Sequence, residues 1–291
     1  MNINLSISYS NNINDIQTDI KSLQLNSLSI KGNAKGKISI ENATINNFYI
    51  SNFSTQQEAL FYSISPNKDK SKLSIHRSNL DNVWFDNIDF NEYSIISLFR
   101  SRFAKSYFTS CNLPNKITDF EKFQPLENVH YPENKPDNYY KDQYEIFLQL
   151  KVALEKTGNY FEALKLKAIS KEALRKIKNI PKSDKCILKI NYWSNEHGLS
   201  ITKPFFGLLI FSIILYLFYL LSINRVFNSS EFDWTLVGQY FSFIDLTHRK
   251  DFLVPKNEFN AWTLIIDFFN KIIVGFFIYQ FIASFRKYGK K

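Results

Sequence analysis

Residues 205–223 read FFGLLIFSIILYLFYLLSI and contain neither a charged residue nor a proline. At a rise of about 1.5 Å per residue, this stretch forms a helix of roughly 28 Å, close to the hydrocarbon thickness of a bilayer, about 30 Å. A buried helix of a large soluble domain is the alternative, but the rest of the chain offers no apolar elements large enough to surround it. We therefore predict that residues 205–223 cross a membrane.

The second apolar stretch of the chain ends at Phe285. Its uncharged part begins at Ile272 and gives only about 21 Å of helix, so a membrane-crossing helix must also include Asp267 and Lys271. These two residues stand four apart and can pair, which lowers a cost of about 2.5–3.5 kcal/mol for each charge at the bilayer centre. The sequence predicts a second membrane helix over residues 259–288 with an intramembrane ion pair.

One face of this second helix is rich in polar residues. Its members recur at alternating steps of three and four residues, which places them on one side of a helix. They are Asn270, Ile273, Phe277, Gln280 and Ser284. Polar side chains in a bilayer face other helices or water. Two interpretations stay open: this face packs on the first membrane helix, or it lines a pore in a homo-oligomer.

The segments that flank the two helices predict how they sit in a bilayer. Residues 181–204 mix apolar and basic residues, which is typical of a helix on the membrane surface. Lys and Arg residues precede the first helix and follow the second. This placement predicts a multi-pass inner-membrane protein with cytoplasmic termini. The connecting loop, residues 224–258, would lie outside, although its own basic residues weaken the contrast. The residues expected at the membrane interface are Trp193, Trp262, Lys189, Lys203, Arg286 and Lys287.

Residues 234–244 in this loop read WTLVGQYFSFI and are aromatic and uncharged. The stretch is too short to cross a bilayer, which takes about 20 residues of helix. It predicts either an interfacial segment or a re-entrant one, and the sequence does not choose between them.

The N-terminal residues 1–114 carry a five-residue period. Large apolar side chains follow it on both sides of a polar interruption over residues 54–74. One series is Ile38, Ala43, Phe48 and Phe53, and a later one is Ile75, Leu80, Phe85 and Phe90. A step of five fits neither a helix nor a plain strand. It predicts a β-solenoid whose coils have five-residue sides and stack at about 4.8 Å. A β-sandwich of short strands is the alternative, but the return of the period after the interruption favours the solenoid.

This period resembles, in degenerate form, that of the pentapeptide-repeat proteins. The sequences NATI at residues 42–45 and SCNL at residues 110–113 stand where that family favours Ala-Asp/Asn-Leu. The resemblance covers about a third of the chain. It implies a square, right-handed β-helix with four sides in each turn.

Two segments connect the solenoid to the membrane helices. Residues 115–136 are rich in proline and without a period, which predicts a linker. Residues 137–180 carry two helical stripes separated at Gly158, and residues 158–174 resemble half of a tetratricopeptide repeat. One helical hairpin cannot bury both of its faces. We expect it to pack on the end of the solenoid, on a partner subunit, or on both.

The sequence contains no arrangement typical of an enzyme, and we expect no enzymatic activity, cofactor or metal. The four histidines, His76, His130, His197 and His248, are scattered and lack metal-ligand spacing, so most are expected at the surface. Asp245 and His248 could form an acid–base pair, but we expect them in a solvated loop. The net charge of +9 gathers beside the apolar stretches, which favours lipid headgroups over nucleic acid as the partner.

The order of these parts resembles a group of bacterial, Bacteroidetes-type pentapeptide-repeat-like membrane proteins, above all in IIDFFNKIIVGFFIYQFIASFRKYGK at residues 265–290. The resemblance implies architecture more firmly than activity. From this architecture we expect a homo-oligomeric membrane protein with a cytosolic sensing or binding domain. Its helices would form a pore or perturb the membrane, in a stress or phage-defence role. The alternative is a membrane-tethered scaffold in which the helices only anchor a β-solenoid that binds a protein partner.

Overall fold

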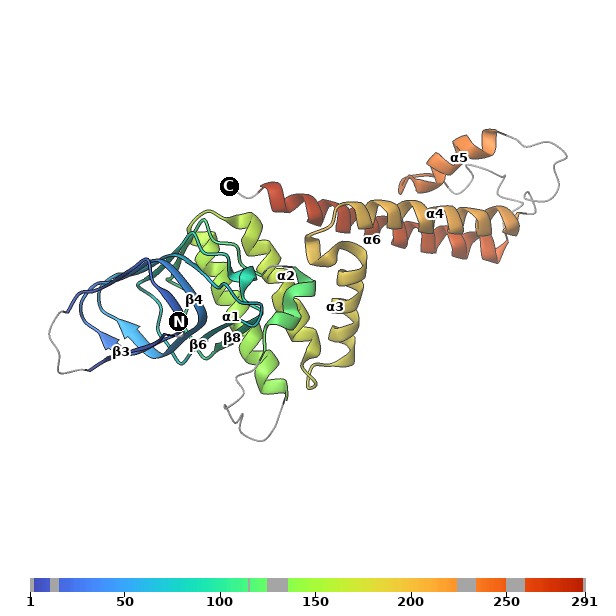
Figure 1. Ribbon diagram of the computed structural model, residues 1–291. Helices are drawn as coiled ribbons and strands as arrows, with labels where there is room; N and C mark the ends of the chain where they lie inside the picture. Colours follow the sequence, from blue (N-terminus) through green and yellow to red (C-terminus); the bar gives the residue numbers. More distant parts are fainter. Residues whose placement is uncertain are drawn as a thin grey trace. The chain divides into compact units, whose positions relative to one another are not determined.

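The computed structural model describes residues 3–10, 16–114, 116–124, 136–223, 234–249 and 260–289 (Figure 1). The chain divides into two compact units, Met1–Lys185 and Cys186–Lys291. The first contains strands and a helical hairpin, and the second contains the long apolar helices.

The first unit is a parallel β-solenoid of about four turns, which confirms the predicted fold class. One ladder stacks β1, β3, β4, β6 and β8, and the other stacks β2, β4, β5, β7 and β9. The long strand β4 belongs to both ladders. The strands are β1 (Asn4–Tyr9), β2 (Thr18–Lys21), β3 (Gln24–Ala34), β4 (Ile38–Thr55), β5 (Ala59–Ser65), β6 (Lys72–His76), β7 (Val83–Asp86), β8 (Ile95–Phe99) and β9 (Tyr107–Thr109).

The five-residue period fits this stacking where a coil has 20 residues, since Leu28 is in register with Phe48, twenty residues later. Phe48 is in register with Leu73, twenty-five residues later, so this coil is longer by five residues. These side chains are buried in one continuous core. The predicted polar interruption over residues 54–74 is wrong in part, because it contains β5, whose Phe61 and Ile64 are buried. That coil keeps its inward side chains although its apolar residues are few.

The corners of the coils are built from residues with positive φ. One column of corners follows the strands of the second ladder and contains Ser22, Asn42, Ser63, Asn87 and Ser110. The other contains Gly32, Asn52, Arg77 and Arg100. The left-handed conformation turns the chain sharply, and it costs roughly 1–2 kcal/mol for a residue with a side chain. Asn and Ser at several corners suit it because their short polar side chains bond locally.

The helical hairpin closes the last coil of the solenoid. It consists of α1 (Pro136–Lys156) and α2 (Tyr160–Lys176). Phe147 and Leu150 of α1 join the solenoid core. Gln149 Oε1 accepts a hydrogen bond of 2.9 Å from Phe103 N, and Gln143 Nε2 donates one of 3.0 Å to Leu98 O. The expected packing on the solenoid's end is confirmed, and α1 satisfies backbone groups that an open sheet edge would expose.

The predicted linker over residues 115–136 is shorter than expected. Residues 115 and 125–135 lie outside the described part, but a 3₁₀ helix, η2 (Ile117–Lys122), occupies the segment before them. Phe120 and Phe123 are buried, and Phe123 forms a parallel bridge with Ile96. This segment therefore belongs to the end of the solenoid. A second 3₁₀ helix, η1 (Phe90–Glu92), lies within the coils.

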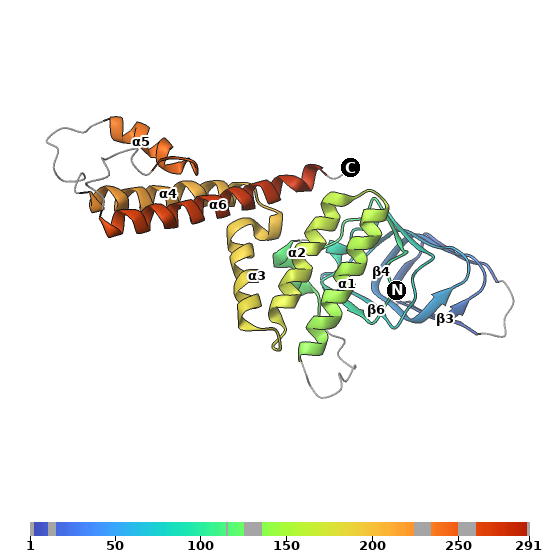
Figure 2. The same ribbon diagram turned by 180° about the vertical axis from the view of Figure 1, so that it is seen from behind.

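The second unit is built on two long helices that lie side by side, α4 (Thr202–Ser222) and α6 (Ala261–Gly289) (Figure 1 and Figure 2). Both are long and apolar enough to cross a membrane, and their bounds lie close to those predicted. They are antiparallel, since Ser222 at the end of α4 bonds Thr263 at the start of α6. The other elements are α3 (Lys182–Asn195), η4 (Glu196–Gly198) and α5 (Thr235–Ile244).

The stacking of β1 on β3 predicts a strong effect at Gly32. A Cβ at this position would lie 2.0 Å from the backbone oxygen of Tyr9, and Gly32 has a φ of +94°. We expect Gly32→Ala to release β1, so that the amides of residues 4–9 exchange hydrogen faster in mass spectrometry. Gly158→Ala is the matched control, because Gly158 also has a positive φ but open space around a Cβ. Equal effects of the two substitutions on β1 would contradict this account.

Candidate polar site between the membrane helices

The polar face of α6 is turned into the unit rather than outward. Its polar members are almost fully buried, with exposed fractions between 0% and 6%: Thr263, Asp267, Asn270, Gln280 and Ser284. Val274 and Phe277 complete the face. Ile273, which the sequence analysis placed on it, is only half-buried, so Val274 takes the inner position instead. The opposite side of α6 exposes large apolar residues, including Phe268 and Ile272.

At the C-terminal end of α6, the polar side chains bond α3 and the turn that follows it. Gln280 Nε2 donates to Asn191 Oδ1 at 3.3 Å, and Asn195 Nδ2 donates to Gln280 Oε1. Ser284 Oγ donates to the backbone oxygen of Ser200 at 2.8 Å. These contacts join the C-terminal part of α6 to α3 and to the turn between α3 and α4.

The short helix α5 packs along the second half of α4. Tyr240 OH and Ser212 Oγ lie 2.8 Å apart, and Tyr216 OH donates to Leu236 O at 2.7 Å. Phe243 is fully buried against the rings of Tyr216 and Tyr219. Ser212 lies ten residues before Ser222, or about 15 Å along the helix. The contacts of α5 therefore extend over the second half of α4.

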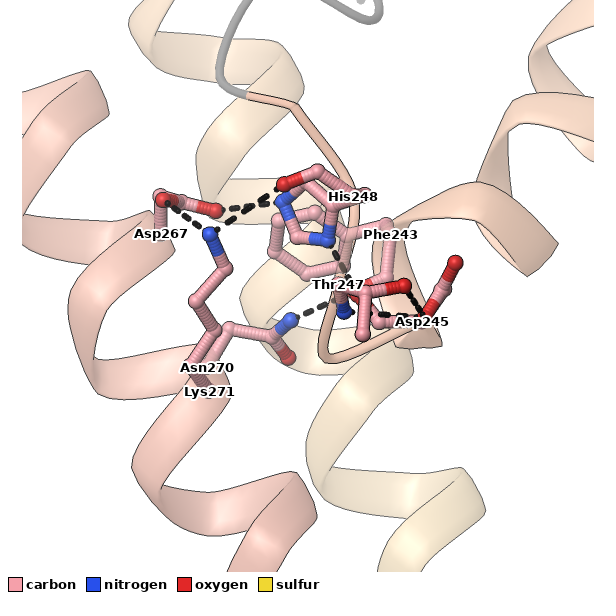
Figure 3. A network of polar contacts seen from close by, with 7 residues as sticks. All are labelled: Phe243, Asp245, Thr247, His248, Asp267, Asn270 and Lys271. Carbon is pink, nitrogen blue, oxygen red and sulfur yellow. Dashed lines mark hydrogen bonds and ion pairs between the residues drawn. The ribbon is translucent and has the colours of Figure 1, made fainter.

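The segment after α5 returns to α6 through a network of charged and amide groups (Figure 3). His248 Nε2 lies 2.6 Å from Asp267 Oδ1, and Lys271 Nζ lies 3.3 Å from Asp267 Oδ2. The His248 and Asp267 side chains are only 3% and 8% exposed. Asn270 Nδ2 donates to the backbone oxygen of Phe243 at 2.6 Å. The network therefore includes the predicted i,i+4 pair of Asp267 and Lys271.

The ring of His248 is placed between two oxygen atoms. Nε2 faces the Asp267 carboxyl group, and Nδ1 contacts the backbone oxygen of Asp245. The His248 ring therefore links the turn after α5 to the Asp267 carboxyl group of α6.

These side chains satisfy a stretch of irregular backbone. Residues 245–248 are not helical, and their polar groups would be costly in apolar surroundings. Asn270 bonds the carbonyl of Phe243 in the last turn of α5, while the Lys271 ammonium lies 3.5 Å from the carbonyl of His248. A cation near the C-terminal end of a helix is also favoured by the helix dipole. The network can hold α5 against α6.

The structure differs from the sequence analysis at His248, which was expected in a solvated loop. Its side chain is buried, and it contacts the backbone of Asp245 rather than the carboxyl group. That carboxyl group accepts hydrogen bonds from Thr247 N and Oγ1, which lower its pKa. Spacing could not reveal the contact of His248 with Asp267, nineteen residues away. The asparagines that bond Gln280 were missed for the same reason.

The residues expected at the membrane interface lie at both ends of the unit. Trp193 and Trp262 are exposed by 58% and 69%. Lys203 Nζ pairs with Glu196 at 2.7 Å and lies over the ring of Tyr192. Lys189 and Arg286 are exposed, and the side chain of Lys287 lies outside the described part.

No protein-family model, curated protein or solved structure matches this chain. The site must therefore be interpreted from its own geometry. Within the described part of the chain, no three His, Cys, Asp or Glu side chains come together as metal ligands would.

Removal of one partner of the Asp267–Lys271 ion pair should lower the stability of the helical unit. Asp267→Leu should lower the free energy of unfolding in detergent micelles by roughly 3 kcal/mol, because it leaves the Lys271 ammonium without its partner. This value is at the lower end for a buried pair because the Lys271 side chain is 29% exposed. The double variant Asp267→Leu with Lys271→Leu should recover the part of the loss that comes from the unpaired ammonium, but not the part that comes from the lost contact of His248 with Asp267.

Phe268→Leu is the control for this pair, because Phe268 is next to Asp267 in sequence but 62% exposed. It should leave the stability nearly unchanged. If the double variant were as unstable as the single one, the ion pair would not be the cause.

Proposed function

We propose that this protein is a membrane-anchored scaffold in which α4 and α6 hold a partner-binding β-solenoid at a membrane. The observation that carries the proposal is the exposure of the two apolar helices. In the most apolar 18 residues of each helix, only 22% of α4 and 28% of α6 are buried within the chain. A core helix of a soluble protein is mostly buried. The apolar surface that remains suits lipid.

The spacing of polar contacts along the helix pair supports an anchor that spans a bilayer. Thr263 bonds Ser222 at one end, and Ser284 bonds the backbone of Ser200 at the other. Thr263 and Ser284 are 21 residues apart, which is roughly 31 Å of helix and close to the hydrocarbon thickness of about 30 Å. Trp262 and Arg286 stand just beyond these two positions, where interfacial side chains are common.

The middle of the helix pair is apolar and closely packed. Residues 272–278 of α6 read IIVGFFI. A Cβ on Gly207 of α4 would lie 2.3 Å from the ring of Phe277, so the two helices approach closely there. Phe277 also stacks on Phe211 at 5.6 Å between ring centroids. Such packing around a small residue suits helix association in lipid.

These contacts favour an anchor over a pore lined by α6. Asn270 and Gln280, the polar residues expected to face a channel, bond groups of the same chain. A homo-oligomeric pore, with a stress or phage-defence role, would require them to leave those partners. One atom favours such a rearrangement: Asn270 Oδ1 is buried and has no hydrogen-bond partner among the described residues.

The anchor predicts that the protein stays in the membrane pellet after an alkaline carbonate wash and enters solution only with detergent. Replacing residues 202–289 by an unrelated two-helix anchor should preserve the effect that expression of the wild-type chain has on the cell. Deleting the same residues without replacement should abolish it. Recovery of the intact chain as a soluble monomer without detergent would contradict the proposal.

Dye release from liposomes distinguishes the anchor from the pore. We expect no release by the wild-type protein, because Asn270 Nδ2 and both polar atoms of the Gln280 side chain bond groups of the same chain. Release that is abolished by Asn270→Leu with Gln280→Leu would instead support the pore. Tyr279→Leu is the control, because Tyr279 is adjacent to Gln280 but 62% exposed on the outer side of the helix.

A further inference from the structure

A hollow of about 450 Å³ lies on the outside of the solenoid. It is lined by Gln56, Gln57, Glu58, Asn82, Trp84 and Tyr107. The two aromatic residues come from adjacent coils, where Trp84 of β7 is in register with Tyr107 of β9. The first three residues lie in the turn between β4 and β5. The volume is within the range of small-molecule sites, about 300–1,000 Å³.

The aromatic wall of this hollow is fixed in place. The ring centroids of Trp84 and Tyr107 are 6.2 Å apart with an interplanar angle of 51°. Trp84 Nε1 donates a hydrogen bond of 2.8 Å to Thr109 Oγ1, which orients the indole although 37% of Trp84 is exposed. Tyr107 is 54% exposed. A ring held by the scaffold loses little conformational entropy when a ligand stacks on it.

The other lining residues lie in or beside the turn between β4 and β5, which is tied to the next coil. Asn82 Nδ2 donates to the backbone oxygens of Thr55 and Gln56, at 3.3 and 3.4 Å, and so ties the turn to the next coil. Gln57 and Glu58 are exposed beside it. The hollow therefore combines two aromatic faces with three side-chain amides and one carboxylate.

This combination selects among ligand classes. Amides both donate and accept hydrogen bonds, as hydroxyl groups do. The faces of aromatic rings carry partial negative charge, which attracts the C–H groups of a sugar ring because each carbon there is attached to oxygen. The six lining residues include Glu58 and no Lys or Arg, which disfavours a phosphate or nucleotide. Two neighbouring rings, tilted by 51°, offer two separate stacking faces rather than the cage that recognises a quaternary ammonium group.

We propose that this hollow binds a neutral carbohydrate, with successive sugar units stacked on Trp84 and Tyr107 and their hydroxyl groups bonded by Gln56, Gln57, Asn82 and Glu58. The proposal rests on the scaffold function above and names the ligand class of its solenoid. It does not depend on how the helices sit in the membrane, because all six residues belong to the solenoid.

The test uses the full chain in detergent on an array of neutral hexose, N-acetylhexosamine and acidic oligosaccharides, followed by calorimetric titration with the neutral glycan that binds best. Trp84→Ala should weaken binding about tenfold or more, and Tyr107→Ala by a similar factor. Thr109→Val keeps the indole but removes its hydrogen bond, so it should have a smaller effect. Phe161→Ala is the control, because Phe161 is an aromatic residue of α2, 44% exposed, in the same unit.

Binding of a neutral glycan that Trp84→Ala weakens and Phe161→Ala does not would support the proposal. Absence of neutral glycan binding across the array, or binding that the Trp84→Ala and Tyr107→Ala variants retain, would overturn it. If Trp84→Ala changed the circular dichroism spectrum, Thr109→Val and Gln57→Leu would decide the question with the fold intact. A protein that stays in the membrane pellet but binds no glycan would refute this inference and leave the anchor standing.

Discussion

Backbone polar groups that are removed from water must find partners, and this requirement governs both units of the protein. An amide or carbonyl group left unpaired in apolar surroundings costs several kcal/mol. In the solenoid, each coil bonds the next along two parallel ladders. The last coil has no successor, and α1 supplies Gln143 and Gln149 to the backbone of Leu98 and Phe103. In the helical unit, Asn270 bonds a carbonyl group in the last turn of α5, and Lys271 bonds one in the segment that follows.

The polar residues of α6 are explained by this requirement. A membrane helix that served only as an anchor would have little need for an aspartate, a lysine and two amides. Here they lie near the ends of the helix pair, where α3 and the α5 segment offer backbone and side-chain partners. The middle of α6 is apolar. Polar side chains in a candidate membrane helix can thus hold neighbouring segments in place as well as line a channel.

The solenoid and the two long helices could be predicted because their signatures are periodic or continuous. The five-residue step at Phe48 and Phe53 and the uncharged run of residues 205–223 each repeat one physical constraint many times. The coil through Phe61 was missed because its apolar residues are few among polar ones. The site was less predictable, since spacing on α6 identifies the face that contains Asp267 and Asn270 but not their partners. His248 and Asp267 are nineteen residues apart, and no local pattern encodes their contact.

The helix that covers the last coil also restricts how this protein can change over evolution. Because α1 recognises backbone atoms of one particular coil, a new coil cannot be appended at that end without displacing it. Gain or loss of coils is therefore expected ahead of this end, through addition or deletion of whole turns. Paired residues of successive coils are 20 to 25 positions apart. Homologous solenoids are thus expected to differ in length by units of about this size, ahead of an unchanged terminal helix.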